Sequence, residues 1–272
     1  MTEHVSQSLD FDAYKPAQIA ARIEAAGVAK VRQDFLTTLM LAVLAGAYIG
    51  FGALLYTIAI TGSEIGWGPT RLLGGLAFSL GLILVIIAGA ELFTGNALVV
   101  MAWADRRISA RELLRNWAIV YVGNLIGAIA TAVLVVLSGA MDLDGGAVGQ
   151  TAASIASAKL KLGLTEAFFR GILCNVLVCL AVWLSFAGRS VIDKVAAIAF
   201  PITAFVGAGF EHSVANMYVI PVAALAGLVE FDLPAAVANL FVVTAGNIIG
   251  GAVLVALVYW LIFGRNASNA AK

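Results

Sequence analysis

The stretch Gly209–Asn216, which reads GFEHSVAN, places a glutamate and a histidine inside a long apolar segment. It is preceded by KVAAIAFPITAFVGA and followed by MYVIPVAALAGLV. Burying an ionisable group in hydrocarbon is costly unless hydrogen bonds or an opposite charge compensate. The stretch therefore predicts a break in a membrane-spanning helix, with its polar groups turned toward the protein interior.

The composition is typical of an integral membrane protein. Of the 272 residues, 62% are hydrophobic and 12% are charged, whereas an ordinary soluble domain has about 25% charged residues. We expect a cytoplasmic segment at residues 1–34, a transmembrane domain at 35–264 and a cytoplasmic tail at 265–272. The first segment lacks the apolar core of a signal peptide. It should contain an amphipathic helix after Pro16, because Ile19, Ile23 and Val28 fall near one face.

Six segments are apolar and long enough to cross a bilayer, which takes about 20 residues in a helix. The second and the fifth exceed this length, and each has polar residues near its middle. The predicted spans are Phe35–Ile60, Leu72–Ala102, Trp117–Leu137, Thr165–Phe186, Val191–Val222 and Ala235–Phe263.

The placement of lysine and arginine predicts the orientation. With the N-terminus in the cytoplasm, twelve of these residues lie in inside segments, and four lie outside, namely Arg71, Lys159, Lys161 and Arg170. Cytoplasmic segments of membrane proteins carry an excess of positive residues. Both termini are therefore expected on the cytoplasmic side of the inner membrane.

Two motifs recur in the second half of the chain. GxExxxxN at Gly89–Asn96 returns at Gly209–Asn216, and NxxxxxxGNxIG at Asn116–Gly127 returns at Asn239–Gly250, with offsets of 120 and 123 residues. Three spans in each half would insert the second copy from the opposite side. We predict an all-α inverted repeat with halves at about 35–138 and 164–264. Spans 2 and 5 would be broken at mid-membrane, around a central binding site.

The ionisable residues at the breaks have more than one interpretation. Glu91 and Glu211 either accept hydrogen bonds from backbone N–H groups freed at the break or take part in transport. His212 either fills packing space or lines the permeation path. Its counterpart in the first half is Leu92, so the repeat does not require a histidine, and we favour the permeation path.

These residues resemble those of the formate/nitrite transporter family. The resemblance runs from Lys30 to Phe263 and rests on GGLAFSLGLILVIIAGAELFTGN, RNW followed by YVGNLIGA, GILCNVLVCLAVW, AGRSVIDK, GFEHSVANMYVIP and AGNIIGG. It implies an aquaporin-like bundle of six spans, assembled as a homopentamer with one pore in each protomer. The implied cargo is a small monovalent weak-acid anion. Formate is favoured over nitrite or hydrosulfide, because the N-terminal helix and AELFT look like the formate-carrying branch.

The resemblance also implies roles for single residues. The central transport site would contain His212, Thr94, Glu211, Asn175 and Asn247. Lys159 would attract the anion in the outer vestibule, and Lys161, two residues away, is the alternative. The apolar constrictions would fall on Phe78, Leu82 and Leu92 on one side of the site and on Phe205 and Val178 on the other.

A proton step is expected at the centre, because a bare anion in a low-dielectric pore is costly. Thr94 and His212 can donate hydrogen bonds, and imidazole titrates near neutral pH. We expect His212 to exchange a proton with the anion, directly or through water. The neutral acid would then pass the apolar constrictions. An anion channel and a proton symporter both fit these residues.

Other classes of protein fit less well. A haem-bearing redox subunit needs axial ligands, often paired histidines, but His4 lies in the polar leader and leaves His212 alone. A receptor or scaffold would not need broken helices around a central site. The arginines at residues 106–115 are explained by orientation and contact with membrane lipid, not by nucleic acid. We therefore expect a transporter without catalytic residues, metal or cofactor.

Overall fold

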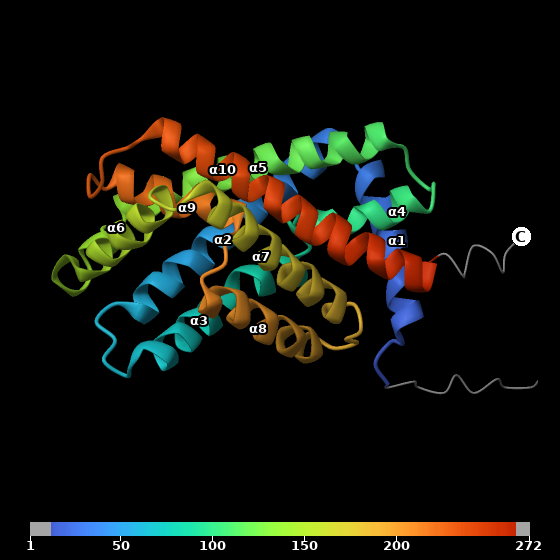
Figure 1. Cartoon of the computed structure of the whole chain (residues 1–272), viewed down its shortest axis with the longest axis horizontal. Coiled ribbons are helices and arrows are strands. Elements are labelled where there is room, and N and C mark those ends of the chain that lie inside the picture. The colour runs from blue at the N-terminus through green and yellow to red at the C-terminus, as the bar shows by residue number, and fades with distance from the viewer. Residues whose placement is uncertain (1–11, 265–272) are drawn as a thin grey trace, which may run out of the picture.

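The computed structural model describes residues 12–264, which form helices joined by short loops (Figure 1). Six helices within this range are apolar and long enough to cross a membrane, which confirms the expected number of spans. They are α2 (Phe35–Ile60), α3 (Trp67–Ala88), α5 (Ala110–Leu137), α7 (Leu164–Ser185), α8 (Val191–Ala208) and α10 (Leu233–Ile248), the last of which continues through π-helical turns at Ile249–Leu257 and Trp260–Gly264. His4 and the expected tail at 265–272 lie outside the described residues.

The two halves of the chain pack in the same manner (Figure 1). Helix α2 lies against α3 and α5, and the corresponding α7 lies against α8 and α10. Helices α3 and α8 pack against each other where the halves meet. The repeated motifs in the sequence therefore correspond to repeated packing in space.

Helices α3 and α8 both end at a glycine in the left-handed conformation. The φ angle is 76° at Gly89 and 74° at Gly209, a region that favours glycine because it has no Cβ. After short non-helical segments at 90–94 and 210–212, the chain forms η1 (Gly95–Val99) with α4 (Val100–Ala104) in the first half and α9 (Ser213–Leu225) in the second. The depth of these breaks in a bilayer stays a prediction.

Glycines at equivalent positions allow close contact between helices in both halves. A Cβ on Gly127 would lie 1.9 Å from the carbonyl oxygen of Val43, and one on Gly250 would lie 2.1 Å from that of Ile172. Both distances are far below van der Waals contact with a backbone atom. No larger residue fits at either position without separating α2 from α5 or α7 from α10.

Two further helices lie outside the spans. Helix α1 (Pro16–Arg32) buries Ile19, Ile23 and Val28, the face expected from the sequence, and packs against η1 and α4. Helix α6 (Ala147–Leu160) follows short 3-10 turns at residues 140–146 and packs against α9. The sequence analysis predicts no helix at this place. Helix α6 matters because Lys159 lies in its last turn.

Helix α1 also buries a carboxyl group. Glu24 is 8% exposed, and its Oε1 has no hydrogen-bond partner among the described residues. Burial, and next the carboxylate of Asp105, raise the pKa of Glu24 from 4.5 to about 7, against an opposing effect of Arg107. Between pH 4.5 and about pH 7, the carboxyl of Glu24 is therefore protonated when α1 is packed and ionised when the carboxyl is free in water. Packing of α1 is favoured most below pH 4.5 and weakens as the pH rises through about 7.

We expect Gly250→Ala to destabilise the bundle, because the new methyl group meets a backbone carbonyl. Overpacking of this kind should lower the unfolding midpoint in detergent by about 5–10 °C. Gly68→Ala is the matched control, because a Cβ there has no atom within 4 Å. A wild-type midpoint for Gly250→Ala would contradict the close contact of α7 and α10.

We expect amide hydrogen exchange in α1 to report the titration of Glu24. After correction for the intrinsic pH dependence of exchange, α1 should open more often at pH 8 than at pH 6. Glu24→Gln should remove this difference, because the amide stays neutral. Glu64→Gln, at an exposed position, should leave the difference unchanged. Persistence of the pH response in Glu24→Gln would assign it to another group.

Candidate functional site

Two cavities enter the bundle from opposite ends of α3 and α8. The Lys159 cavity, of about 400 Å³, is lined by the N-terminal half of α3 and the C-terminal end of α8, together with α2, α6, α7 and α9. The Lys30 cavity, of about 300 Å³, is lined by the C-terminal half of α3, the N-terminal end of α8, α1 and α7. No residue lines both cavities.

The partition between the cavities has apolar residues on both of its faces. Phe78 lines the Lys159 cavity, and Leu82, four residues further along α3, lines the Lys30 cavity. Four residues of α-helix span about 6 Å. Phe78 packs edge to face on Phe205, with ring centroids 5.6 Å apart. Leu92 faces the Lys30 cavity.

The grouping of these apolar residues differs from the expected one. The sequence analysis places Phe78 together with Leu82 and Leu92, but Phe78 lies with Phe205 on the Lys159 side. The reason is that α3 passes both cavities, so residues one turn apart face different ones. Val178 is buried and lines neither of the two cavities.

His212 and Thr94 join the two broken segments across the partition. The Nδ1 atom of His212 accepts a hydrogen bond from the backbone N–H of Ala215, at 3.1 Å, and thereby caps α9. The neutral ring must then carry its hydrogen on Nε2. Nε2 lies 2.8 Å from Oγ1 of Thr94 and donates to it. A second proton, on Nδ1, would remove the acceptor of the Ala215 N–H.

The environments of these two side chains differ. His212 lines the Lys159 cavity, and its ring stacks beside Phe205 with centroids 6.0 Å apart. Thr94 is fully buried and lines neither cavity. The pair therefore has one member at the base of a cavity and one inside the partition.

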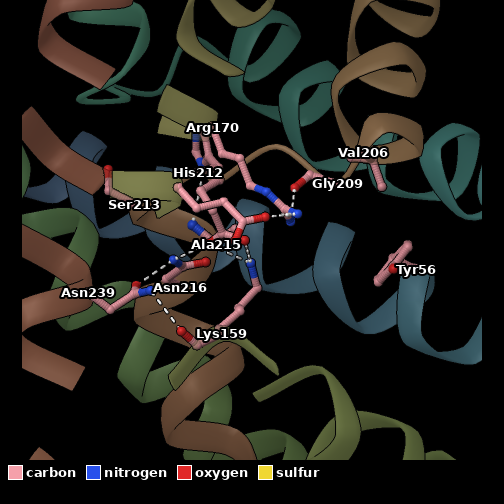
Figure 2. A network of polar contacts seen from close by, with 12 residues as sticks. Tyr56, Lys159, Arg170, Val206, Gly209, His212, Ser213, Ala215, Asn216 and Asn239 are labelled. Carbon is pink, nitrogen blue, oxygen red and sulfur yellow. Dashed lines mark hydrogen bonds and ion pairs between the residues drawn. The ribbon is translucent and has the colours of Figure 1, made fainter. Parts of the chain in front are cut away.

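Lys159 is ion-paired (Figure 2). Its Nζ donates to both carboxylate oxygens of Glu211, at 2.9 Å each, and Nδ2 of Asn216 donates to Oε2 of the same carboxylate at 2.8 Å. Nδ2 of Asn239 donates to the backbone oxygen of Lys159 at 3.1 Å. The resemblance predicts Lys159 as the cation that attracts the anion, but the adjacent Glu211 offsets its charge.

The Lys30 cavity contains a matching group, which the sequence analysis misses. Nζ of Lys30 lies 2.6 Å from Oε1 of Glu91, and Nδ2 of Asn96 donates to Oε2 at 2.6 Å. Both glutamates thus bind a lysine and an asparagine through their carboxylates and do not bind the freed backbone N–H groups. Lys30 and Lys159 are 129 residues apart. Neither repeat offset connects them, so sequence comparison of the halves does not reveal Lys30.

The side-chain amide of Asn247 fastens the segment that carries His212. Its Oδ1 accepts from the backbone N–H of Ser213 at 2.9 Å, and its Nδ2 donates to the carbonyls of Gly171 at 2.8 Å and Glu211 at 3.0 Å. Asn247 is fully buried and lines neither cavity. Its hydrogen bonds are to backbone, not to the space that a substrate would occupy.

Asn124 fastens the first broken segment in the same way. Its Oδ1 accepts from the N–H of Phe93 at 2.9 Å, and its Nδ2 donates to the carbonyls of Ala42 at 2.8 Å and Glu91 at 2.9 Å. The repeated GNxIG motif therefore has a physical explanation, since its asparagine bonds to one N–H and one carbonyl at the broken segment and to one carbonyl of a neighbouring helix, α2 or α7.

Asn175 connects the supports of the two halves. Its Nδ2 donates to the carbonyl of Thr94 at 3.2 Å and to that of Asn247 at 2.6 Å. Like Asn247, it is buried and lines neither cavity. The hydrogen bond from Asn175 therefore fixes the backbone of Thr94 on the side away from the cavities.

The charges that line the cavities favour anions at both ends. Each lining contains three cationic side chains and one carboxylate, so each cavity has a positive field. In the Lys159 cavity these residues are Arg71, Lys159, Arg170 and Glu211. In the Lys30 cavity they are Arg22, Lys30, Lys194 and Glu91. Within residues 12–264, no three His, Cys, Asp or Glu side chains lie close enough together to hold a metal ion.

Comparison with known proteins gives consistent matches. A family model described as "Formate/nitrite transporter" matches residues 17–261. "Formate channel FocA" of Escherichia coli (strain K12) is 41% identical over 278 residues, which covers 94% of this chain and 96% of that protein. Among solved structures, "Pentameric formate channel with formate bound" has a TM-score of 0.78 at 42% identity and covers 84% of this chain and 97% of that one. "FNT family ion channel" has a TM-score of 0.83 at 30% identity, with coverage of 90% and 98%.

We expect Asn247→Leu to destabilise the protein, because it removes three hydrogen bonds and leaves the N–H of Ser213 and the carbonyl of Glu211 without this partner. Each buried unsatisfied group costs about 1–3 kcal/mol, so thermal unfolding in detergent should begin well below the wild-type temperature. Ser138→Ala removes a single local bond to Val135 and should have little effect. Equal unfolding temperatures for the two variants would contradict the fastening role.

Proposed function

The chain belongs to the formate/nitrite transporter family, and we propose that it carries formate across a membrane through one pore in each protomer of a homopentamer. It is a multi-pass membrane protein whose relatives are channels and transporters. The names of two of those relatives, a formate channel and a pentameric channel with formate bound, support both parts of the proposal.

The orientation is part of this proposal. We place the Lys159 cavity toward the outside of the inner membrane and the Lys30 cavity, with residues 1–34 and 265–272, toward the cytoplasm. The excess of lysine and arginine in the segments next to the Lys30 cavity supports this choice.

One observation carries the proposed mechanism: two positively lined cavities approach each other along α3, where Phe78 lines one and Leu82, about one helical turn away, lines the other. The cavities concentrate a small anion at both faces. Phe78 and Phe205 on one side, and Leu82 and Leu92 on the other, offer no group that replaces the hydration of a charge. An ion that crosses such a layer loses much of its solvation energy. A weak acid avoids most of this cost if it crosses in its neutral form.

The proton is proposed to pass through His212. His212 lines the Lys159 cavity, and its Nε2–H already has a partner in Thr94. A proton from cavity water that reaches Nδ1 breaks the bond from Ala215 and frees the Nε2 hydrogen for the anion. Formic acid then crosses the partition. The hydrogen bond from Ala215 restores the starting tautomer once Nε2 is protonated again and Nδ1 loses its proton.

The buried amides act as positioning residues in this scheme. Asn247 fixes the segment that bears His212, and Asn175 fixes Thr94. Glu211 holds Lys159 at the wall of the cavity. We place none of these three in direct contact with the formate that crosses the partition.

We expect His212→Phe to slow formate uptake into proteoliposomes by about 100-fold, the lower range for removal of a group that transfers protons. The uptake that remains should lose the pH dependence of the wild type. Thr94→Ser keeps the hydroxyl group and should keep both rate and pH profile. The measurement is uptake of radiolabelled formate between pH 5 and pH 8.

Two results would contradict the proposal in different ways. If His212→Phe carries formate with an unchanged pH profile, the proton does not pass through this ring. If the wild-type protein carries nitrite or hydrosulfide well and formate poorly in the same vesicles, the substrate assignment is wrong, although the proton step stands.

A further inference from the structure

Arg170 marks a difference between the two otherwise matching halves. Its backbone carbonyl accepts from the N–H of Glu211 at 3.3 Å, and in the other half the carbonyl of Leu41 accepts from the N–H of Glu91 at 3.2 Å. Arg170 and Leu41 therefore occupy equivalent places beside the two broken segments. At this position beside the broken segment, the Lys159 cavity has the guanidinium of Arg170, whereas the equivalent residue in the other half is the apolar Leu41.

Arg71 supplies a second guanidinium to the same cavity. Its Nε donates to the carbonyl of Gly207 at 2.9 Å, and its Nη2 donates to that of Val206 at 2.8 Å. Nη1 lies 3.4 Å from the hydroxyl of Tyr56. The carbonyls belong to the last turn of α8, and that of Val206 also accepts from the N–H of Gly209 at 3.0 Å. None of these partners is a carboxylate, so the charge of Arg71 is not offset as that of Lys159 is.

Both guanidiniums lie close to Gly209, and Figure 2 shows that of Arg170. Nη1 of Arg170 donates to the carbonyl of Gly209 at 3.1 Å, while its Nη2 pairs with the exposed Glu166. A Cβ on Gly209 would lie 3.0 Å from Nη2 of Arg71 and 3.7 Å from Nη1 of Arg170. Because residue 209 has no side chain, the space between the two cations stays open to the cavity.

Both guanidiniums keep donors for a ligand. Arginine has five N–H groups. The bonds above use three of them on Arg71 and two on Arg170. We propose that Arg71 and Arg170 form an anion-binding site in the Lys159 cavity, which holds a small planar oxyanion before it reaches His212. The inference rests on the proposed function and adds a residue-level basis for selecting the substrate.

The geometry selects anions with two oxygens. Guanidinium groups donate parallel N–H bonds that match the two oxygens of a carboxylate. Formate has this shape, so one ion accepts from both arginines. Chloride and hydrosulfide have a single acceptor atom and gain fewer directed bonds. The site therefore prefers formate to single-atom anions of the same charge.

Chemical modification tests binding without any need for transport. Phenylglyoxal should modify Arg71 and Arg170 in the assembled wild-type protein, as followed by mass spectrometry of peptides. We expect formate to slow this modification at least threefold relative to chloride at equal ionic strength. Arg111, which is exposed and lies outside both cavities, should react equally in both salts. Equal protection by chloride, or no protection, would overturn the inference.

The second test is formate transport by the variant Arg170→Leu. This substitution introduces the residue type that Leu41 has at the equivalent place in the first half. The half-saturating formate concentration for entry through the Lys159 cavity should rise about fivefold, a loss of about 1 kcal/mol in binding. Entry through the Lys30 cavity, measured in vesicles of opposite sidedness, should change less. Arg111→Leu removes the same charge elsewhere and is the control. An unchanged half-saturation would overturn the inference.

The anion-binding site and the transport of formate can be disproved separately. If formate protects Arg71 and Arg170 but the wild-type protein does not transport formate, the site stands and the proposed function is wrong. If formate is transported without protection, the function stands and the site is wrong. If Arg170→Leu does not assemble, the modification experiment on the wild-type protein decides.

Discussion

The structure depends on the satisfaction of backbone groups where two helices stop inside an apolar bundle. At Gly89 and Gly209 the chain turns out of its helix, and some of the N–H and carbonyl groups that follow, such as the carbonyls of Glu91 and Glu211, need partners from elsewhere. In hydrocarbon such groups have no water to bond with. The side-chain amides of Asn124 and Asn247 supply the missing acceptor and donors in each half. The positions of Thr94 and His212 follow from these six hydrogen bonds.

In this arrangement, the residues that hold the broken segments in place are different from the residues that line the cavities. The asparagines that carry the broken segments are fully buried, whereas the lysines, arginines and His212 line open space. The ion pairs Lys30–Glu91 and Lys159–Glu211 lie between the buried asparagines and the other residues that line the cavities. They bring a positive charge to the cavity wall without leaving a buried carboxylate unpaired. Positive potential beyond these pairs must therefore come from other residues, chiefly arginines.

Much of the architecture could be predicted from the sequence because it depends on local properties. The apolar length of each span, the glycines at the breaks and the repeated motifs are all visible along the chain. The pairing of Lys30 with Glu91 was not predicted, because Lys30 lies 129 residues before Lys159, an offset that neither repeated motif has. Helix α6 was also missed. The grouping of Phe78 with Phe205 depends on the rotation of α3 about its axis, which an almost wholly apolar sequence does not reveal.

The separate fastening of the two broken segments has an evolutionary consequence. In a duplicated gene, each copy that carries its own asparagine can mutate at the tip of its loop without unfolding the other copy. Leu92 and His212 occupy such tips, so two copies with the same support hold a leucine in one loop and a histidine in the other. The same backbone support thus allows the two ends of the bundle to differ in their side chains.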